Sequence, residues 1–308
     1  MTVAVIGGTG FIGAIVCKQL VESGQKVICI DYNPFMDRIK SIRDKVTIIN
    51  ANITQFEELL EIFVENKITA IIDFAYLLDA ESTRKPHQAL KVNVMGTNNV
   101  FEAARLAGIK RVIWSSSVAI YGRKDPGLPL TEDDPCQPLT IYGACKQLGE
   151  FMSQVYNQKY GMEVAAIRPS AVFGPGRITG LSSFISDIVT LPALGLEAVI
   201  PSSPDKRSTF TFVDDMAADF VSLALAPKLE HAVYNARGWV RSYGDVADTV
   251  RKYIPDAKIT FTGSPTYYAS WLDGSRLEAA IQRPLKYTFE EGIREQINRV
   301  RQFGALGI

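Results

Sequence analysis

The chain has 308 residues, and its 33 Lys and Arg residues balance its 33 Asp and Glu residues. This length allows one large domain, or a large domain with a smaller one, around a substantial core. A net charge of zero provides no overall field to attract nucleic acid or an anionic membrane, so binding depends on a local site. The histidines are His87 and His231 alone, which argues against a histidine-built metal site or a Ser-His-Asp triad, and we expect no metal.

Cysteine usage and the N-terminus indicate the compartment. The cysteines show no C-x-x-C spacing, the N-terminus enters a strand-like segment without a basic leader, and no apolar stretch reaches 18 residues. Neither export nor a membrane-spanning helix is indicated. A reducing cytoplasm is the expected location.

The first half of the chain alternates short apolar runs with longer helical patterns. The runs are too apolar for half-solvated strands, as is typical of strands covered on both faces, and the segments between them have apolar residues at three- and four-residue steps. This alternation predicts an α/β fold, a Rossmann doubly wound parallel sheet. The predicted strands are 3–7, 26–31, 46–51, 70–75, 111–116 and 163–169.

The alternation fails after Pro169. Residues 170–208 are rich in Gly, Pro and Ser, and a strand-like YNARG and a helical SYGDVADTVRKYI follow later. We therefore predict a Rossmann domain over 1–169 with a return segment near 208–235. A smaller, partly interleaved substrate-binding domain is expected over 170–308.

Glycines at 7, 10 and 13 stand between the first predicted strand and the first predicted helix. Gly7 would make the tight turn, Gly10 would let the backbone approach a pyrophosphate, and Gly13 would let helix and strand pack closely. The spacing predicts a dinucleotide site. The alternative is an ordinary glycine-rich turn.

Asp31 ends the second predicted strand, 18 residues after Gly13. A carboxylate here can accept hydrogen bonds from an adenosine ribose and would repel a 2′-phosphate. Since no basic residue follows until Arg38, the pattern favours NAD over NADP. The alternative is that Asp31 only forms a turn.

Serines 115, 116 and 117 end the fifth predicted strand, where open α/β sheets bind ligands. Tyr142 and Lys146 follow at helical i and i+4 spacing, so the ammonium can lie near the phenol and lower its pKa. A tyrosinate could then take the proton of a secondary alcohol, and a serine hydroxyl could bind the same oxygen. Taken alone, such a pair is more often a solvated helix face.

Together these motifs resemble the extended short-chain dehydrogenases/reductases, in the NAD-dependent epimerase/dehydratase group typified by UDP-galactose 4-epimerase. The resemblance covers nearly the whole chain: GGTGFIG, VNVMGTNNVFEAA, SSSVAIYG, YGACK, RPSAVFGPG, RSTFTFVDD and LDGSRLEAAIQRPLKYTFEEGI.

The resemblance implies roles for individual residues. Tyr142 would be the catalytic acid or base, Lys146 would assist it and bind the nicotinamide ribose, and Ser117 would polarise the substrate oxygen. Ser115 would lie against the cofactor. Other positions around NAD would be Phe11, Ile12, Asn52, Ile53, Phe74, Ala75, Tyr76, Asn93 and Pro169.

Several positions depart from the family pattern. Dehydratases of this group have Thr-Asp-Glu where this chain has Ser117, Val118 and Ala119, which disfavours dehydration. Sugar-nucleotide enzymes usually have an asparagine where this chain has Ala171, whereas the arginine that grips the nucleotide diphosphate is retained as Arg207. The alternative for Arg207 is a salt bridge to Asp214 or Asp215.

The turn after the fourth predicted strand reads FAY instead of the usual apolar-Ala-Ala. Tyr76 could reshape the floor of the site or could simply be core packing.

Three functions follow from these observations. The first is an epimerase acting on a sugar or sugar nucleotide through a keto intermediate, which the retained Arg207 and Asp31 favour. The second is an NAD-dependent dehydrogenase or ketone reductase acting on a free sugar or other small alcohol with cofactor release, which Tyr76 and Ala171 favour. A non-catalytic dinucleotide sensor is a minor alternative. In relatives, the helices matching 91–107 and 142–160 form a dimer contact, so a homodimer is expected.

Overall fold

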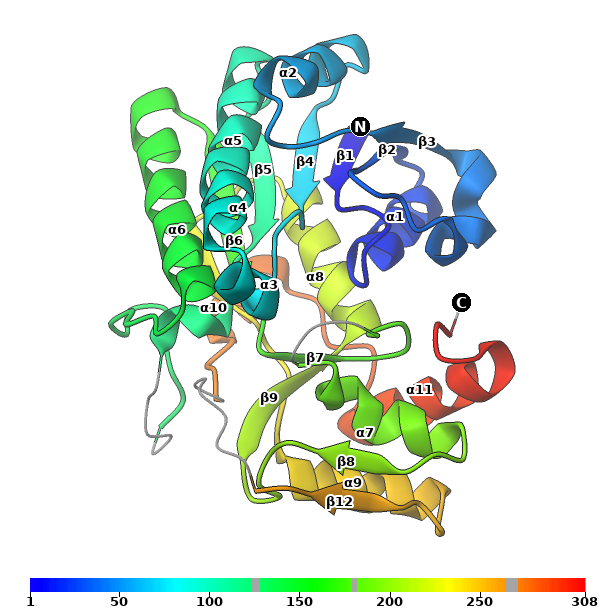
Figure 1. The fold of residues 1–308 in the computed structure, drawn as a ribbon. Helices are drawn as coiled ribbons and strands as arrows, with labels where there is room; N and C mark the ends of the chain where they lie inside the picture. Colours follow the sequence, from blue (N-terminus) through cyan, green and yellow to red (C-terminus); the bar gives the residue numbers. More distant parts are fainter. Residues whose placement is uncertain (123–127, 179–181, 264–270, 308) are drawn as a thin grey trace.

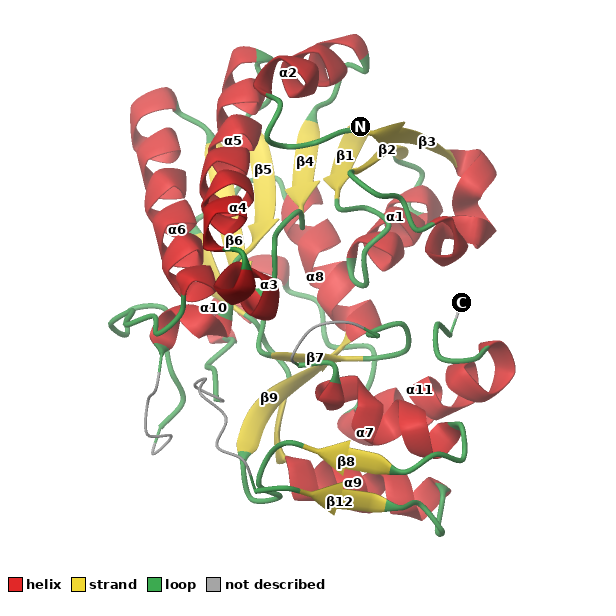
Figure 2. Cartoon of the chain, viewed as in Figure 1, coloured by secondary structure: helices red, strands yellow, loops and turns green. Residues whose placement is uncertain are grey.

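The computed structural model describes residues 1–122, 128–178, 182–263 and 271–307. A seven-stranded sheet with strand order β10-β6-β5-β4-β1-β2-β3 forms its centre, and every pairing in it is parallel. This confirms the predicted doubly wound α/β fold (Figures 1 and 2). The strands are β1 (Thr2–Ile6), β2 (Lys26–Asp31), β3 (Val46–Asn50), β4 (Ala70–Asp73), β5 (Arg111–Ser115), β6 (Glu163–Arg168) and β10 (Val233–Asn235).

Neighbouring residues of the central strands enter different cores. In β1, Val3 and Val5 belong to one apolar cluster, whereas Ala4 and Ile6 belong to another, because successive side chains of a strand point to opposite faces. The first cluster lies under α1 (Gly13–Glu22), the 3₁₀ segment η1 (Met36–Lys45) and α8 (Val213–Leu225). The second lies under α2 (Phe56–Glu65), α5 (Thr97–Leu106) and α6 (Ile141–Tyr160).

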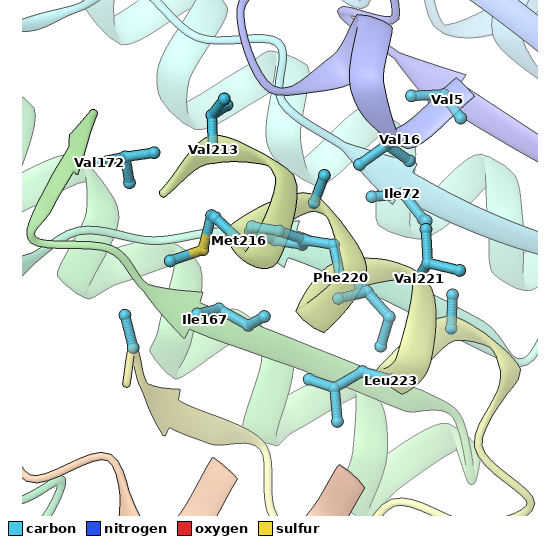
Figure 3. Packing of buried hydrophobic residues seen from close by; sticks show 14 of the residues in the cluster. Val5, Val16, Ile72, Ile167, Val172, Val213, Met216, Phe220, Val221 and Leu223 are labelled. Carbon is cyan, nitrogen blue, oxygen red and sulfur yellow. The ribbon is translucent and has the colours of Figure 1, made fainter. Parts of the chain in front are cut away.

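Helix α8 shows why the later part of the chain returns to the sheet. Its Met216, Phe220 and Leu223 are fully buried, and Figure 3 shows this face of the helix among Val16 of α1 and Ile167 of β6. At roughly 2 kcal/mol for each large apolar side chain removed from water, this contact fixes α8 firmly on the sheet. β10 follows α8 and pairs with β6.

A smaller group of elements lies beyond the carboxyl ends of the large sheet (Figure 1). It has a three-stranded sheet of order β11-β9-β7, a two-stranded sheet β12-β8, and a core cluster of its own. The division after residue 169 stays a prediction. The elements are β7 (Ala171–Phe173), α7 (Phe184–Ala193), β8 (Ala198–Ile200), β9 (Arg207–Phe212), β11 (Trp239–Ser242), α9 (Tyr243–Tyr253), β12 (Ile259–Phe261) and α11 (Phe289–Phe303).

Short helical segments complete the fold. Those that follow β4 are α3 (Asp79–Arg84), α4 (Pro86–Leu90) and η2 (Lys91–Gly96), and η3 (Val118–Tyr121) follows β5, whereas α10 (Ser275–Ile281) precedes α11. None of the helices in the described ranges has the length and apolar character needed to cross a bilayer.

Candidate active site

Three segments meet at the carboxyl edge of the large sheet: the turn after β4, the end of β5 and the first turns of α6. Helix α6 starts at Ile141 because the Thr140 hydroxyl caps it, accepting a hydrogen bond from Gly143 N–H at 3.1 Å. Tyr142 therefore lies in the first turn. Lys146 lies one turn later on the same face.

Ser117 is brought to Tyr142 by a close approach of α6 to η3. A Cβ on Gly143 would lie 2.7 Å from the carbonyl oxygen of Ala119, so only glycine allows this packing. The Ser117 side chain lies close enough to the Tyr142 hydroxyl to lower its pKa. The sequence contained this signal in the Tyr-Gly dipeptide, which our sequence reasoning left unused.

The electrostatics of Tyr142 differ from the sequence-based expectation. Burial raises the pKa of Tyr142 to about 12. The neighbouring Ser117 hydroxyl and the charge of Arg177 lower this pKa, and the charge of Asp79 raises it. We expected a pKa lowered by Lys146, and for this structure that expectation is wrong. Loss of hydration outweighs the stabilising groups.

Lys146 is itself deprived of water, with 2% of the residue exposed. Its Nζ donates to the backbone oxygen of Ser115 at 2.5 Å and lies 5.5 Å from the centre of the Tyr142 ring. Burial lowers the pKa of Lys146 to about 7, against the opposing charge of Asp73. The ammonium can therefore change its proton state near neutral pH.

Asp73 is a member of the site that the sequence reasoning missed. It ends β4, is 4% exposed, and accepts a hydrogen bond from Ala75 N–H at 2.9 Å. Burial raises its pKa to about 6, while that hydrogen bond and the charge of Lys146 lower it. The sequence did contain a signal for Asp73, because an acidic residue ends the otherwise apolar run AIID.

The glycine loop has the shape that a dinucleotide needs. Gly7 adopts φ +71°, and a Cβ on Gly13 would lie 2.2 Å from the Gly7 oxygen. A Cβ on Gly10 would meet only that same oxygen, at 3.0 Å, and would otherwise occupy the open side of the loop. Phe11 and Ile12 lead from this loop into α1. The N–H of Ala14 donates to the Gly10 oxygen at 3.1 Å, whereas the N–H groups of Phe11, Ile12 and Gly13 have no backbone partner in the described part of the chain. These features fit a bound pyrophosphate.

Asp31 lies at the carboxyl end of β2, beside the loop. Its Oδ2 accepts from the N–H and the hydroxyl of Thr9, at 3.1 and 2.6 Å, and its Oδ1 accepts from Asn33 N–H at 3.2 Å. Oδ1 keeps a lone-pair site for a ribose hydroxyl, whereas Thr9 already occupies both sites of Oδ2. Arg38 also comes close, because its guanidinium donates to the Thr9 oxygen at 3.3 Å and the Gly176 oxygen at 2.7 Å.

Other residues proposed to surround the cofactor serve the fold with their side chains. Asn52 accepts from the Thr54 N–H and hydroxyl, both at 3.0 Å, and Ile53 is core. Asn93 is fully buried and binds both backbone groups of Leu77. Ala75 and Tyr76 follow β4 at the sheet edge. Phe74 packs edge-on against Phe220, and the Pro169 oxygen accepts from Val118 N–H.

Arg207 is exposed at the start of β9. The alternative of a salt bridge to Asp214 or Asp215 is wrong, because Arg299 pairs with the first at 2.6 Å and Arg283 with the second at 3.4 Å. Ala171 is buried in the core of the smaller part.

Arg177 is a second group that the sequence reasoning missed. Its guanidinium donates to the Val172 oxygen and to the Ser182 hydroxyl, the latter at 2.5 Å, and lies 5.8 Å from the Phe11 ring. Burial lowers its pKa to about 10. It thus presents a positive charge between the glycine loop and Tyr142.

Known proteins resemble this chain over most of its length. The NAD dependent epimerase/dehydratase family matches residues 3–236. A putative UDP-glucose 4-epimerase of Methanocaldococcus jannaschii is 27% identical, over 96% of this chain and 97% of that protein.

Two solved structures show the same fold. The UDP-glucose 4-epimerase of Thermus thermophilus in complex with NAD is 24% identical with a TM-score of 0.87, over 98% of this chain and 100% of that one. An L-threonine dehydrogenase of Cupriavidus necator is also 24% identical, with a TM-score of 0.86, over 97% and 100%.

Proposed function

Because the chain belongs to the NAD dependent epimerase/dehydratase family, we propose that this enzyme epimerises a sugar or sugar nucleotide at a secondary carbinol through a keto intermediate. The observation that carries the proposal is Tyr142, which lies beside Ser117 and one helical turn from Lys146 at the edge of the sheet. NAD, when bound, supplies the hydride acceptor and donor. The glycine loop and Asp31 would hold it.

The chain's own residues would move the proton. Tyr142 Oη would take the proton of the carbinol hydroxyl and later return it, while Ser117 would hydrogen-bond the same oxygen. The charge of Arg177 would favour the phenolate form of Tyr142, and Lys146 would assist the transfer and bind the nicotinamide ribose. Arg207 would hold a nucleotide diphosphate away from the reacting carbon, so that the ketone could turn in the site.

The first experiment is to denature the purified protein and identify the released nucleotide, before and after dialysis. Retained NAD, followed by interconversion of UDP-glucose and UDP-galactose in an NMR assay, is the expected result. Tyr142→Phe should keep the bound NAD and lose roughly 100- to 10,000-fold in turnover. A protein that exchanges NAD freely and converts no sugar nucleotide would contradict the proposal.

Arg177 favours a second candidate, an NAD-dependent dehydrogenase of a small alcohol that carries an anionic group. A guanidinium with little hydration beside Tyr142 would bind a carboxylate strongly, and one structural neighbour is the L-threonine dehydrogenase of Cupriavidus necator.

The two arginines discriminate between the candidates. Arg207→Met should raise the KM for a nucleotide sugar and leave a small hydroxy acid unaffected. Arg177→Met should raise the KM for a hydroxy acid, which is measured by NADH absorbance. The same rise is expected in the otherwise wild-type protein and in the Arg207→Met variant.

We also propose that the enzyme is a homodimer. A groove of about 460 Å³ between α4, η2 and α6 is lined by Leu90, Met95 and Leu148 among others, and Phe151 beside them is 62% exposed. A second copy would cover these apolar side chains. Light scattering should give a dimer mass, and Phe151→Glu should halve it, whereas Val64→Glu on α2 should not.

A cytoplasmic location belongs to the same proposal. It is supported by the cysteines, none of which forms a disulfide within the described residues.

A further inference from the structure

Tyr76 touches both members of the proposed proton-transfer pair. The Lys146 Nζ lies 3.1 Å from the centre of the Tyr76 ring. The same ring meets the Tyr142 ring edge-on, with centres 5.7 Å apart and planes at 89°. A residue that could have been ordinary core packing thus contacts both the ammonium and the ring of the phenol.

The backbone that carries Tyr76 is held in place. The next residue, Leu77, donates its N–H to Asn93 Oδ1 at 2.8 Å, and its carbonyl oxygen accepts from Asn93 Nδ2 at 3.0 Å. Asn93 is fully buried and also binds the Ser82 hydroxyl at 3.2 Å. The ring therefore has a fixed attachment point.

The ring face, not the hydroxyl, is the part that Lys146 meets. The Tyr76 hydroxyl is buried beside Thr97 and makes no hydrogen bond of standard geometry to the residues that the structure describes. An aromatic face attracts a cation most strongly where water is absent. Lys146 is in such a place, with one N–H donated to the Ser115 oxygen.

The other charged groups around Lys146 support it less directly. Asp73 approaches from β4 and Glu150 from α6, and both favour the ammonium through their charge. Glu150 is already committed to Arg168 at 2.7 Å. Burial raises the pKa of the Cys145 thiol, so this neighbour stays neutral at physiological pH.

We propose that Tyr76 is a positioning residue whose ring face holds the Lys146 ammonium, in its charged form, against the ring of Tyr142. This role replaces the hydration that burial removes. The inference concerns the state of Lys146 itself, and it rests on the proposed function only for its consequence in turnover.

The test reads Lys146 without any substrate. Protein labelled with ¹³C at lysine Cε is titrated by NMR, and the Lys146 signal is assigned by its loss in Lys146→Met. Tyr76→Phe keeps the ring and should titrate at the wild-type midpoint. Tyr76→Leu removes the ring and should lower the midpoint by roughly one pH unit, since the charged form loses its partner.

Circular dichroism and a melting curve check that each variant is folded, and Tyr76→Met carries the same comparison if Tyr76→Leu does not fold. A folded Leu or Met variant with the wild-type midpoint would overturn the proposal. So would a Phe variant that titrates like Leu, because the hydroxyl would then be the responsible group. Failure to turn over sugar nucleotides leaves this titration unaffected, so the two proposals can fail separately.

Discussion

Helix α6 carries two buried charges one turn apart, Lys146 and Glu150, and their surroundings treat them in opposite ways. Glu150 is 5% exposed and accepts from both Nε and Nη2 of Arg168, at 2.9 and 2.7 Å, and from the Ser116 hydroxyl at 2.5 Å. Lys146 is similarly buried, but it has one carbonyl oxygen and the face of Tyr76.

The consequence appears in the proton affinities. Burial alone would lower the pKa of Arg168, but hydrogen bonds and the charge of Glu150 outweigh it, and the pKa is raised. For Lys146 burial prevails, and its pKa falls to about 7. A fully paired charge stays fixed and holds the fold together, whereas a charge with few partners can change its proton state, which acid–base chemistry requires.

The largest expected effect is on stability, from Arg168→Met. This change leaves the Glu150 carboxylate buried without its partner, so the free energy of unfolding should fall by about 3–5 kcal/mol. Urea denaturation followed by circular dichroism measures it. The double variant Arg168→Met/Glu150→Leu should recover most of the loss. If both variants were equally unstable, packing would be the cause, and the contrast with Lys146 would lose its basis.

Lys146→Met should show the reverse pattern. Removing an ammonium that burial disfavours should leave the free energy of unfolding at pH 7 unchanged or raise it. Turnover should nevertheless fall roughly 100-fold or more, because the proposed proton transfer loses its supporting charge. A loss of several kcal/mol in stability would show that Lys146 is a structural charge like Arg168.

Most of the fold could be predicted from the sequence, because apolar runs covered on both faces leave little choice of architecture. The predicted strand 26–31 coincides with β2, and 70–75 is longer than β4 by only two residues. Motif spacing also predicted that Ser117 and Tyr142 share one substrate oxygen, and these two residues lie close together in the structure. These features depend on local patterns, which a single sequence displays.

The sequence could not give the electrostatics. The pKa of Tyr142 depends on how completely water is excluded and on Asp79 and Arg177, which lie 63 residues before it and 35 after it. In the sequence Asp73 is only the end of a predicted strand, and the three-dimensional structure is needed to show that its carboxyl lies near Lys146. Proton affinities follow from three-dimensional neighbours, for which spacing carries no signal.

The most specific test of this comparison is the pH dependence of stability, and it concerns Asp73. Its pKa in the folded chain is about 6 against an ordinary 3.8, so between about pH 4 and 6 the folded state holds a proton that the unfolded state has released. Wild-type stability should therefore fall as pH rises through this window. Asp73→Asn removes that slope, so its stability relative to wild type should rise by about 3 kcal/mol from pH 4 to 6 and then level off.

Lys146 titrates in a separate window, which provides the control for this measurement. Its pKa of about 7 against an ordinary 10.5 means that the unfolded state holds the extra proton between about pH 7 and 10. Wild-type stability should therefore rise as pH rises through this window. Lys146→Met should lose the rise in the upper window and leave the Asp73 slope below pH 6 in place.

A stability difference for Asp73→Asn that stays flat from pH 4 to 7 would mean that Asp73 is ionised throughout and directly paired. The site around Lys146 would then resemble the Glu150–Arg168 pair, and its proposed role in proton transfer would lack the electrostatic freedom on which it depends.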